Sequence, residues 1–322
     1  MCDASVRSHA SHHIAFESGK MACVAWLKAA RPLAHANIAL PLVYGQAFAH
    51  ATTGAFSWTW FAVSHAFGVV VHLFIVFAND YADRDADRMN LASTIVSGGS
   101  RVLPNGELTP AAIRAAAAGA AVLLVLGSSA VAWFGARPAA PLLALVSVAL
   151  LWAYSYPPLR LSYRGHGEWL QAVGTGAVLP AVGYLFQAGS FAKMPTAALL
   201  APVCLGLASN VLTALPDTEA DRLAHKRTLP VRWGERRARW TALVYTFVAA
   251  VAPVLGHRGE RDPWFLLTPL VATALLGASL TQVRRADSSN RRACLAFIFL
   301  VAGAGQLLLL GWSVSLFRHV PR

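Results

Sequence analysis

Charged residues are absent from long stretches of this chain, and their spacing constrains the fold more than any other feature. No Asp, Glu, Lys or Arg lies between Arg31 and Asp80. A helix needs about 20 apolar residues to cross a bilayer, and a charge at the bilayer centre is costly. The first stretch has room for two helices with a break at 50–57. Seven further charge-free runs follow it, so the sequence predicts nine transmembrane helices in all. The further charge-free runs cover residues 115–136, 138–159, 169–192, 194–216, 240–257, 263–283 and 293–317.

The composition favours a membrane protein and excludes other classes. Of the 322 residues, 56% are hydrophobic and 13% are charged, whereas a soluble domain has about 25% charged residues. The strand-like alternation of an outer-membrane barrel is missing from the runs. We therefore expect an all-α, polytopic membrane protein. In this interpretation residues 1–22 form a polar cytoplasmic tail, and residues 23–318 form a single nine-helix transmembrane domain.

The basic residues predict the orientation of the chain. The N-terminal segment and every second connecting segment after it together hold 21 of the 27 Lys and Arg residues. The segments on the opposite side, which include the C-terminal one, hold the other 6. The positive-inside rule then places the N-terminus in the cytoplasm and the C-terminus outside. The net charge of +12 is therefore mostly topology information. It does not predict a nucleic-acid partner, because that would need a basic face on a soluble domain.

Seven of the 15 acidic residues occupy two short stretches at the cytoplasmic ends of two predicted helices, at 79–87 and 217–221. At about 100° per residue, most of their side chains share one face of each helix, while Asp85 and Glu219 point away. The residues that share a face are Asn79, Asp80, Asp83 and Asp87 in the first stretch, and Asp217 and Asp221 in the second.

Clustered carboxylates at a membrane surface repel one another and resist desolvation. Mg²⁺ removes both problems, because it binds carboxylates together with phosphate oxygens. Two clusters on separate helices predict two metal ions that hold a diphosphate. Arg101, in the Gly-rich segment 97–101, and the pair Lys226 and Arg227 are placed to neutralise it further. Arg160 and Arg164 are weaker candidates, because a role in topology alone explains them equally well.

These stretches resemble the UbiA superfamily of intramembrane aromatic prenyltransferases. Asn79-Asp80-x-x-Asp83-x-x-x-Asp87 matches its N-D-x-x-D-x-x-x-D motif, and Asp217-x-x-x-Asp221 followed by Lys226-Arg227-Thr228-Leu229 is similar to its second motif. The resemblance extends over nearly the whole chain and includes 28–32, 97–109 and 154–165. The last two segments are most similar to the MenA branch, which prenylates 1,4-dihydroxy-2-naphthoate.

One departure from that branch concerns the acceptor. MenA-like members usually have N-x-R-D at the start of the second motif, whereas this chain has Ala214-Leu215-Pro216-Asp217. Asn210 lies seven residues before Asp217 and can present its amide to the same face. Pro216 is expected to bend the helix between them.

The resemblance implies a UbiA-like helical bundle in the bacterial inner membrane, with its active site facing the cytoplasm. The implied reaction is Mg²⁺-dependent transfer of a polyprenyl group from a prenyl diphosphate to an aromatic acceptor. Tyr154 is interpreted either as a residue that stabilises the allylic cation or positions the acceptor, or as an ordinary interfacial tyrosine. The implied metal ligands are Asn79, Asp80, Asp83, Asp87, Asp217 and Asp221. The implied catalytic residues are Asn79, Asp83, Asp217, Asp221, Arg101 and Lys226, and the implied substrate-binding residues are Asp80, Asp87, Arg227, Tyr154, Arg160 and Asn210.

Three other functions compete with this interpretation. A prenyl-diphosphate cyclase on the same fold needs the same diphosphate site but no acceptor. A transporter would place its charges near the midplane, often within inverted repeats, and neither feature is evident. A CDP-alcohol phosphotransferase has one compact acidic motif, whereas 130 residues separate Asp87 from Asp217. The length of the prenyl chain and the oligomeric state stay open.

Overall fold

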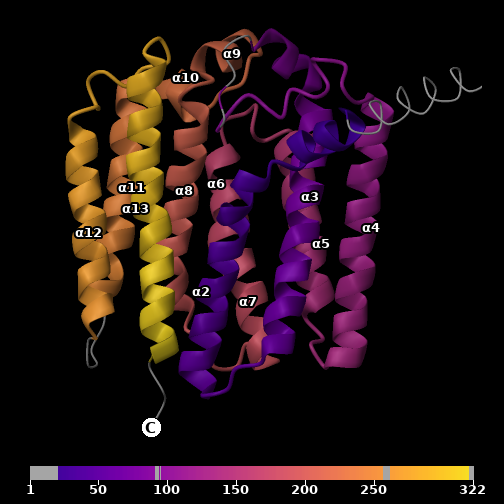
Figure 1. Ribbon diagram of the computed structural model, residues 1–322, viewed down its shortest axis with the longest axis vertical. Coiled ribbons are helices and arrows are strands. Elements are labelled where there is room, and N and C mark those ends of the chain that lie inside the picture. The colour runs from indigo at the N-terminus through magenta and orange to yellow at the C-terminus, as the bar shows by residue number, and fades with distance from the viewer. Residues whose placement is uncertain (1–20, 91–93, 95, 257–261, 319–322) are drawn as a thin grey trace, which may run out of the picture.

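The computed structural model describes residues 21–90, 94, 96–256 and 262–318. Helices are the regular secondary structure of these residues. The long helices lie side by side along the vertical axis of Figure 1, and the connecting segments gather at the two ends of the bundle. The predicted tail at 1–22 lies outside the described residues except for its last two positions.

The first half of the bundle follows the predicted runs closely. Residues 21–30 are helical, and the chain turns back within 54–57, inside the predicted break. Side-chain caps explain two of the starts, because Ser57 accepts a hydrogen bond from the Trp60 N–H and Thr109 accepts one from the Ala112 N–H. The elements are η1 (Pro32–His35), α2 (Ala36–Thr53), α3 (Trp58–Met89), α4 (Pro110–Gly135) and α5 (Ala140–Ser155).

The second half contains two short helices that the charge-free runs do not predict, α9 and α10. The predicted run at 169–192 becomes α6, a single π-helical turn η2, and α7 in direct succession. The elements are α6 (Gly167–Val173), η2 (Gly174–Val178), α7 (Leu179–Ala188), η3 (Thr196–Leu199), α8 (Leu200–Ala214), α9 (Thr218–Leu223), α10 (Leu229–Trp233), α11 (Glu235–Gly256), α12 (Pro263–Leu280) and α13 (Arg291–Arg318).

Seven helical segments of the described chain are long and apolar enough to cross a membrane. They identify an integral membrane protein. The remaining two predicted positions also hold helices, but α5 has only 16 residues, and α2 carries the polar residues Asn37, Gln46 and His50. The seven segments are α3, α4, α6 to α7, η3 to α8, α11, α12 and α13.

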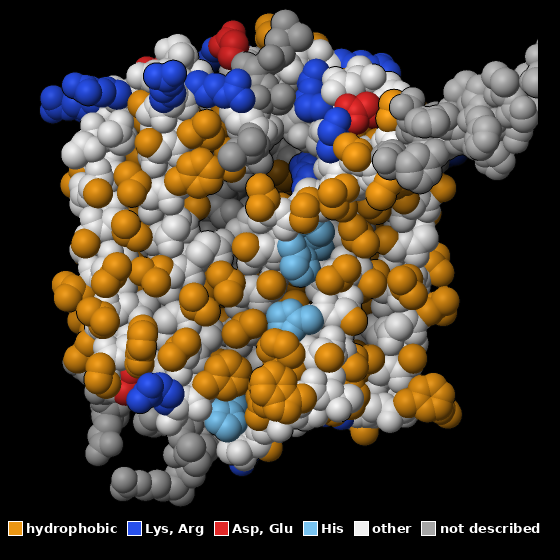
Figure 2. Space-filling view, in the orientation of Figure 1, with side chains coloured by type: hydrophobic (Ala, Val, Ile, Leu, Met, Phe, Trp, Pro, Cys, Tyr) orange, Lys and Arg blue, Asp and Glu red, His pale blue; other side chains and the backbone are white. Residues whose placement is uncertain are grey.

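The outermost helices show which surface faces lipid. In Figure 1, α4 and α12 lie at opposite edges of the bundle. Only 17% and 22% of their apolar windows are buried, against 61% for the segment formed by η3 and α8. Figure 2 shows hydrophobic side chains over the middle of the molecule and many Lys and Arg side chains at its upper end. Such a large apolar surface is costly in water but not against lipid tails.

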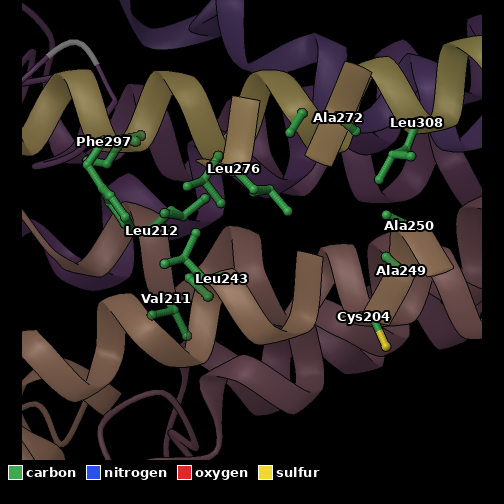
Figure 3. Close-up of a cluster of buried hydrophobic side chains, with 14 of the residues drawn as sticks. Cys204, Val211, Leu212, Leu243, Ala249, Ala250, Ala272, Leu276, Phe297 and Leu308 are labelled. Atoms are coloured by element: carbon green, nitrogen blue, oxygen red, sulfur yellow. The ribbon is translucent and has the colours of Figure 1, made fainter. Parts of the chain in front are cut away.

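Three buried clusters hold the described helices together, and one of them joins residues 21–30 to α3, α4 and α5. In the first, side chains from α8, α11, α12 and α13 point toward one another, among them Leu212, Leu243, Leu276 and Phe297 (Figure 3). The second joins α2 to α7, where a Cβ atom on Gly45 would overlap the Pro180 carbonyl oxygen. Helices in membranes associate through such close packing of small residues, because apolar burial does not drive association in lipid.

Candidate active site

The two acidic stretches, far apart in the sequence, meet at one end of the bundle. The first occupies the last turns of α3, as its helical register predicts. The second lies on α9, which packs against α3. Two contacts join these regions. Lys226, five residues after the second stretch, places its Nζ 2.7 Å from Asp83 Oδ2. Asn90, three residues after the first stretch, donates from Nδ2 to Asp217 Oδ1 at 2.9 Å.

Asp83 is held at both carboxylate oxygens. It is only 5% exposed, and its Oδ1 accepts a hydrogen bond from the Tyr163 hydroxyl at 3.0 Å while Oδ2 contacts Lys226. The Lys226 ammonium also lies 4.9 Å from the centre of the Tyr163 ring. Burial alone would lower the pKa of Lys226, but the neighbouring carboxylate of Asp83 raises it well above its usual range. Lys226 therefore stays protonated.

The second acidic stretch has a different local structure from the one expected. It is not the end of a long helix, because α8 stops at Ala214 and Asp217 precedes the first residue of α9. Pro216 lacks a backbone N–H and so cannot continue the hydrogen-bond ladder of α8. Burial raises the pKa of Asp221 to about 7 and also raises the pKa of Asp217.

Hydrogen bonds fix both carboxylates of α9. Asp217 Oδ2 accepts from the Gly98 N–H at 2.9 Å, and Asp221 Oδ2 accepts from the Thr228 hydroxyl at 3.0 Å. Gly98 belongs to the Gly-rich segment between α3 and α4, so this segment is tied to α9. The Gly-rich segment therefore contacts residues of both acidic stretches, Asp217 through Gly98 and Asp80 through Ser100.

The other residues of the first motif take separate partners. Asp80 is buried, forms an ion pair with Arg31 and accepts a hydrogen bond from the Ser100 hydroxyl. Asn79 Oδ1 accepts from the Ser155 hydroxyl at 3.2 Å. The Asp87 carboxylate lies against Gly99, where a Cβ atom would overlap it and where φ is +71°. Glycine is needed there for both its small size and its left-handed backbone.

Asp85 and Glu219 point away from the site, in agreement with the helical register. Both side chains are exposed, and they form ion pairs one turn along their own helices, with Arg88 and Arg222. These two acids therefore provide control positions on the same helices as the candidate ligands.

The predicted basic residues have different surroundings. Arg101 Nη1 donates to the carbonyl oxygens of Asp87 and Asn90 and so braces the end of α3. The guanidinium of Arg160 stacks 3.6 Å from the centre of the Tyr163 ring. Arg227 is exposed, and its backbone N–H donates to the Tyr163 carbonyl. Lys226 is the member of this predicted group that forms an ion pair within the first acidic motif.

A group of neutral, hydrogen-bonded side chains, here called the amide cluster, connects Tyr154 to α6 and α8. Asn210 is 5% exposed, and its Nδ2 lies 3.3 Å from the Tyr154 hydroxyl and 2.8 Å from Gln171 Oε1. Gln171 Nε2 then donates to the Ser209 hydroxyl at 3.1 Å. The amide cluster therefore consists of Tyr154, Asn210, Gln171 and Ser209.

Sequence reasoning missed several residues of this site. Tyr163 lies within the segment 154–165, whose resemblance was noted, but nothing in the spacing indicated that it contacts Asp83. Asn90 lies three residues beyond the first motif and could have been found by extending it. Gln171 and Ser209 carry no sequence signal, because a single polar residue in an apolar run usually packs against a neighbouring helix.

The chemistry of these side chains suits a hard divalent cation. Carboxylate and amide oxygens are ligand types that Mg²⁺ prefers. Burial raises the pKa values of Asp217 and Asp221, because the surrounding protein solvates their negative charge less well than water does. A bound cation would therefore stabilise the ionised forms. Within the described part of the chain, however, no three Asp, Glu, His or Cys side chains already form a closed metal site.

The helical bundle has the fold of solved UbiA homologues. A solved UbiA homologue from Archaeoglobus fulgidus, described as bound to DMAPP and Mg²⁺, has a TM-score of 0.66 to this structure. The match covers 91% of this chain and 99% of that one, at 16% identity. The chain belongs to the UbiA prenyltransferase family, whose model matches residues 38–302. It is therefore a prenyltransferase.

Curated relatives differ in their substrates. The chain is 28% identical to a digeranylgeranylglyceryl phosphate synthase from Natronomonas pharaonis, over 75% of this chain and 83% of that protein. It is 26% identical to a 2-carboxy-1,4-naphthoquinone phytyltransferase from Synechocystis, over 74% and 76%. A 1,4-dihydroxy-2-naphthoate octaprenyltransferase from Bacillus subtilis is 27% identical over 42% of this chain and 45% of that protein.

Proposed function

We propose that this chain transfers a polyprenyl group from a prenyl diphosphate to an aromatic acceptor, with 1,4-dihydroxy-2-naphthoate as the acceptor to test first. The reaction would depend on Mg²⁺. The observation that carries the proposal is the convergence of Asp83, Lys226, Asp217 and Asp221, from two distant segments, at one end of an apolar bundle. The two naphthoate-related relatives support this class of acceptor.

Bound Mg²⁺ would supply positive charge that holds the diphosphate and stabilises it as it leaves. In this proposal Asp80 and Asp87 assist from positions beside Arg31 and Gly99. The principal ligands would be Asn79, Asp83, Asp217 and Asp221.

Lys226 would act on the leaving diphosphate. Its raised pKa keeps the ammonium charged, and its position beside Asp83 puts this charge where negative charge grows in the transition state. Arg101, Arg160 and Arg227 would add weaker electrostatic support from the loops around it. Preorganised charges of this kind are effective because they need no rearrangement during the reaction.

The acceptor would lie against the amide cluster. Tyr154 and Asn210 would orient the hydroxyl groups of its ring, so that an electron-rich ring carbon faces the allylic carbon of the prenyl chain. The bond between that allylic carbon and the diphosphate oxygen breaks, the ring carbon forms the new bond, and the ring then loses its proton. The loop from α3 to α4, tied to α9 through Gly98, would exclude water from the cation.

In the same proposal the chain crosses the membrane nine times, with α2 and α5 completing the set. The site then faces the cytoplasm of a bacterial cell, the N-terminus lies on the same side, and the C-terminus lies outside. The basic side chains at the upper end in Figure 2, where the acidic stretches also lie, support this orientation.

The decisive experiment supplies the purified full chain, in lipid nanodiscs, with radiolabelled geranylgeranyl diphosphate and 1,4-dihydroxy-2-naphthoate. We expect a prenylated 1,4-dihydroxynaphthyl product, identified by mass spectrometry, that disappears when EDTA removes Mg²⁺. A cyclised product without acceptor would instead identify a prenyl-diphosphate cyclase. Product from a glyceryl phosphate acceptor alone would contradict the aromatic class and favour the activity named for the Natronomonas relative.

A further inference from the structure

Exposed arginines gather where α11, α12 and α13 meet, at the end of the bundle that carries the site. Figure 2 shows Lys and Arg side chains at the upper end of the molecule, over the part that Figure 1 labels α11, α12 and α13. Five of them are here called the arginine surface. They are Arg236 and Arg237 in the first turn of α11, Arg284 and Arg285 just after α12, and Arg292 in the first turn of α13.

Buried hydrogen bonds hold the turn between α12 and α13 against the start of α11. Arg239 is only 4% exposed, and it donates from Nε to the Val283 carbonyl oxygen at 2.8 Å and from Nη1 to the Ala286 carbonyl oxygen at 2.5 Å. Glu235 accepts from the Ser288 N–H at 2.7 Å and from the Ser288 hydroxyl at 2.6 Å. The arginine surface is therefore built on a fixed base.

The two acidic residues of these segments are already engaged. Glu235 also forms an ion pair with Arg239, at 3.6 Å and one turn along α11. Asp287 accepts from the Ser289 hydroxyl at 2.6 Å and from the Asn290 N–H at 2.9 Å. Within the described part of the chain, none of the five arginines of the surface forms an ion pair. The protein itself therefore leaves their positive charge uncompensated.

The helix faces that carry these arginines become apolar within two turns. On α11, Arg236 shares a face with Trp240 and Phe247, which are 46% and 49% exposed. On α13, Phe299 lies seven residues after Arg292 on the same face and is 51% exposed. Tryptophan is enriched at the boundary between headgroups and acyl chains. The arginine surface therefore lies at headgroup depth, above helix faces that contact lipid tails.

We propose that the arginine surface binds the headgroup of an anionic phospholipid whose acyl chains lie against α11, α12 and α13. Guanidinium groups suit this ligand, because each can donate two parallel hydrogen bonds to phosphate oxygens. A zwitterionic phospholipid fits less well, since its ammonium group cancels the charge of its phosphate. A free anion would leave the apolar faces below unused. Basic clusters at helix ends attract anionic headgroups, and this site is independent of the proposed reaction.

Native mass spectrometry of the purified full chain tests the proposal. The protein is released from micelles that contain equal amounts of dioleoylphosphatidylglycerol and dioleoylphosphatidylcholine. The wild type should retain the anionic lipid at least about tenfold more often than the zwitterionic one. The triple variant with Arg284→Gln, Arg285→Gln and Arg292→Gln should lose this preference. If the triple variant does not fold, Arg284→Gln and Arg292→Gln alone should each lower the preference about fivefold.

The matched control replaces Arg88, Arg114 and Arg222 with glutamine. These arginines are exposed at the same end of the bundle, but they lie outside the arginine surface and have other partners, namely Asp85, the Tyr81 ring and Glu219. Both triple variants lose three positive charges, so a general attraction between a basic protein and anionic lipid would affect them equally. Equal retention of the two lipids by the wild type, or an equal loss of preference in both triple variants, would overturn the inference.

The unfolding temperature of the wild type gives a second measurement that needs no variant. It should rise when phosphatidylglycerol is added but not when phosphatidylcholine is added, because a ligand that binds the folded state stabilises it. Sodium chloride should reduce this rise, because salt screens exposed charges. Millimolar inorganic phosphate should reduce it no more than sodium chloride of the same ionic strength. Complete loss of the rise in phosphate alone would identify a site for free anions and contradict a lipid site.

Discussion

Among single residues, Asp83 binds partners from two different segments of the chain, one at each carboxylate oxygen. Lys226 comes from the segment after α9 and Tyr163 from the segment after α5, and both reach the carboxylate within hydrogen-bond distance. A side chain held at both oxygens is oriented before any ligand arrives. Such preorganisation is the main way in which a protein stabilises developing charge.

Removing the charge of a candidate ligand should stop prenyl transfer. Asp83→Asn and Asp221→Asn keep the size of the side chain but lose a carboxylate, so we expect a fall in kcat of at least about 100-fold. Asp85→Asn and Glu219→Gln are the matched controls, because both side chains are exposed on the same helices. Near-normal turnover in Asp83→Asn, or an equal loss in the controls, would show that the ligands are wrongly assigned.

Tyr163 is a positioning residue, since it acts on the chemistry through Asp83. Tyr163→Phe removes the hydroxyl that donates to Asp83 Oδ1. A lost partner of a metal ligand typically costs about 10- to 100-fold in metal affinity or activity, so the Mg²⁺ concentration for half-maximal rate should rise by about tenfold. Tyr184→Phe, whose hydroxyl contacts Thr52 on α2, should leave this concentration unchanged. If the rate of Tyr163→Phe fell by the same factor at every Mg²⁺ concentration, the positioning role would be wrong.

At the scale of elements, the short helix α9 connects the two halves of the site. It exists because Pro216 ends the hydrogen-bond ladder of α8 and the chain restarts at Asp217. Its neighbour α10 is anchored by Arg232, which lies 3.5 Å from the buried carboxylate of Glu168 at the start of α6. The position of Lys226, between α9 and α10, therefore depends on two short helices of six and five residues.

The contact between α2 and α7 should be the most sensitive helix–helix contact to a small substitution. Gly45→Ala would place a methyl group on the Pro180 carbonyl oxygen and separate the two backbones. Overpacking of this kind costs about 1–3 kcal/mol, so the unfolding temperature in detergent should fall. Gly119→Ala on α4, where a Cβ atom meets nothing within 4 Å, should leave it unchanged or raise it. Equal unfolding temperatures for the two variants would contradict this close packing.

At the scale of the whole molecule, charge and apolar surface are arranged along one axis. The apolar middle matches the bilayer, and the end that carries the site also carries much of the basic charge. The same end contains every segment that contributes a candidate ligand. A substrate with an anionic head and an apolar tail would meet both environments in this arrangement, the head at the charged end and the tail in the bundle.

Reporter fusions test the orientation and the number of spans together. Green fluorescent protein inserted at the exposed Gly106 should fluoresce, because that loop is expected in the cytoplasm. Alkaline phosphatase fused after Arg322 should be active, because nine spans place the C-terminus outside. The reverse pattern would overturn the orientation, and a cytoplasmic C-terminus with a cytoplasmic Gly106 would overturn the odd number of spans.

Much of the fold was predictable because it depends on local patterns. Charge-free runs located the helices within a few residues, as for α12 and α13. The register of Asp80, Asp83 and Asp87 followed from the helical repeat alone. The form of the second stretch was not predicted, because the sequence pattern does not show where a helix that contains Pro216 stops.

The sequence by itself determined that this is a helical membrane protein with two acidic faces, since desolvation of charge and the helical repeat act over a few turns. Only the tertiary structure decided which carboxylate takes which partner. Lys226 and Asp83 are 143 residues apart, and Gln306 and Asn37, whose side-chain amides form a hydrogen bond, are 269 apart. Contacts over such separations depend on how whole helices pack, and packing is set by the combined shape of many side chains.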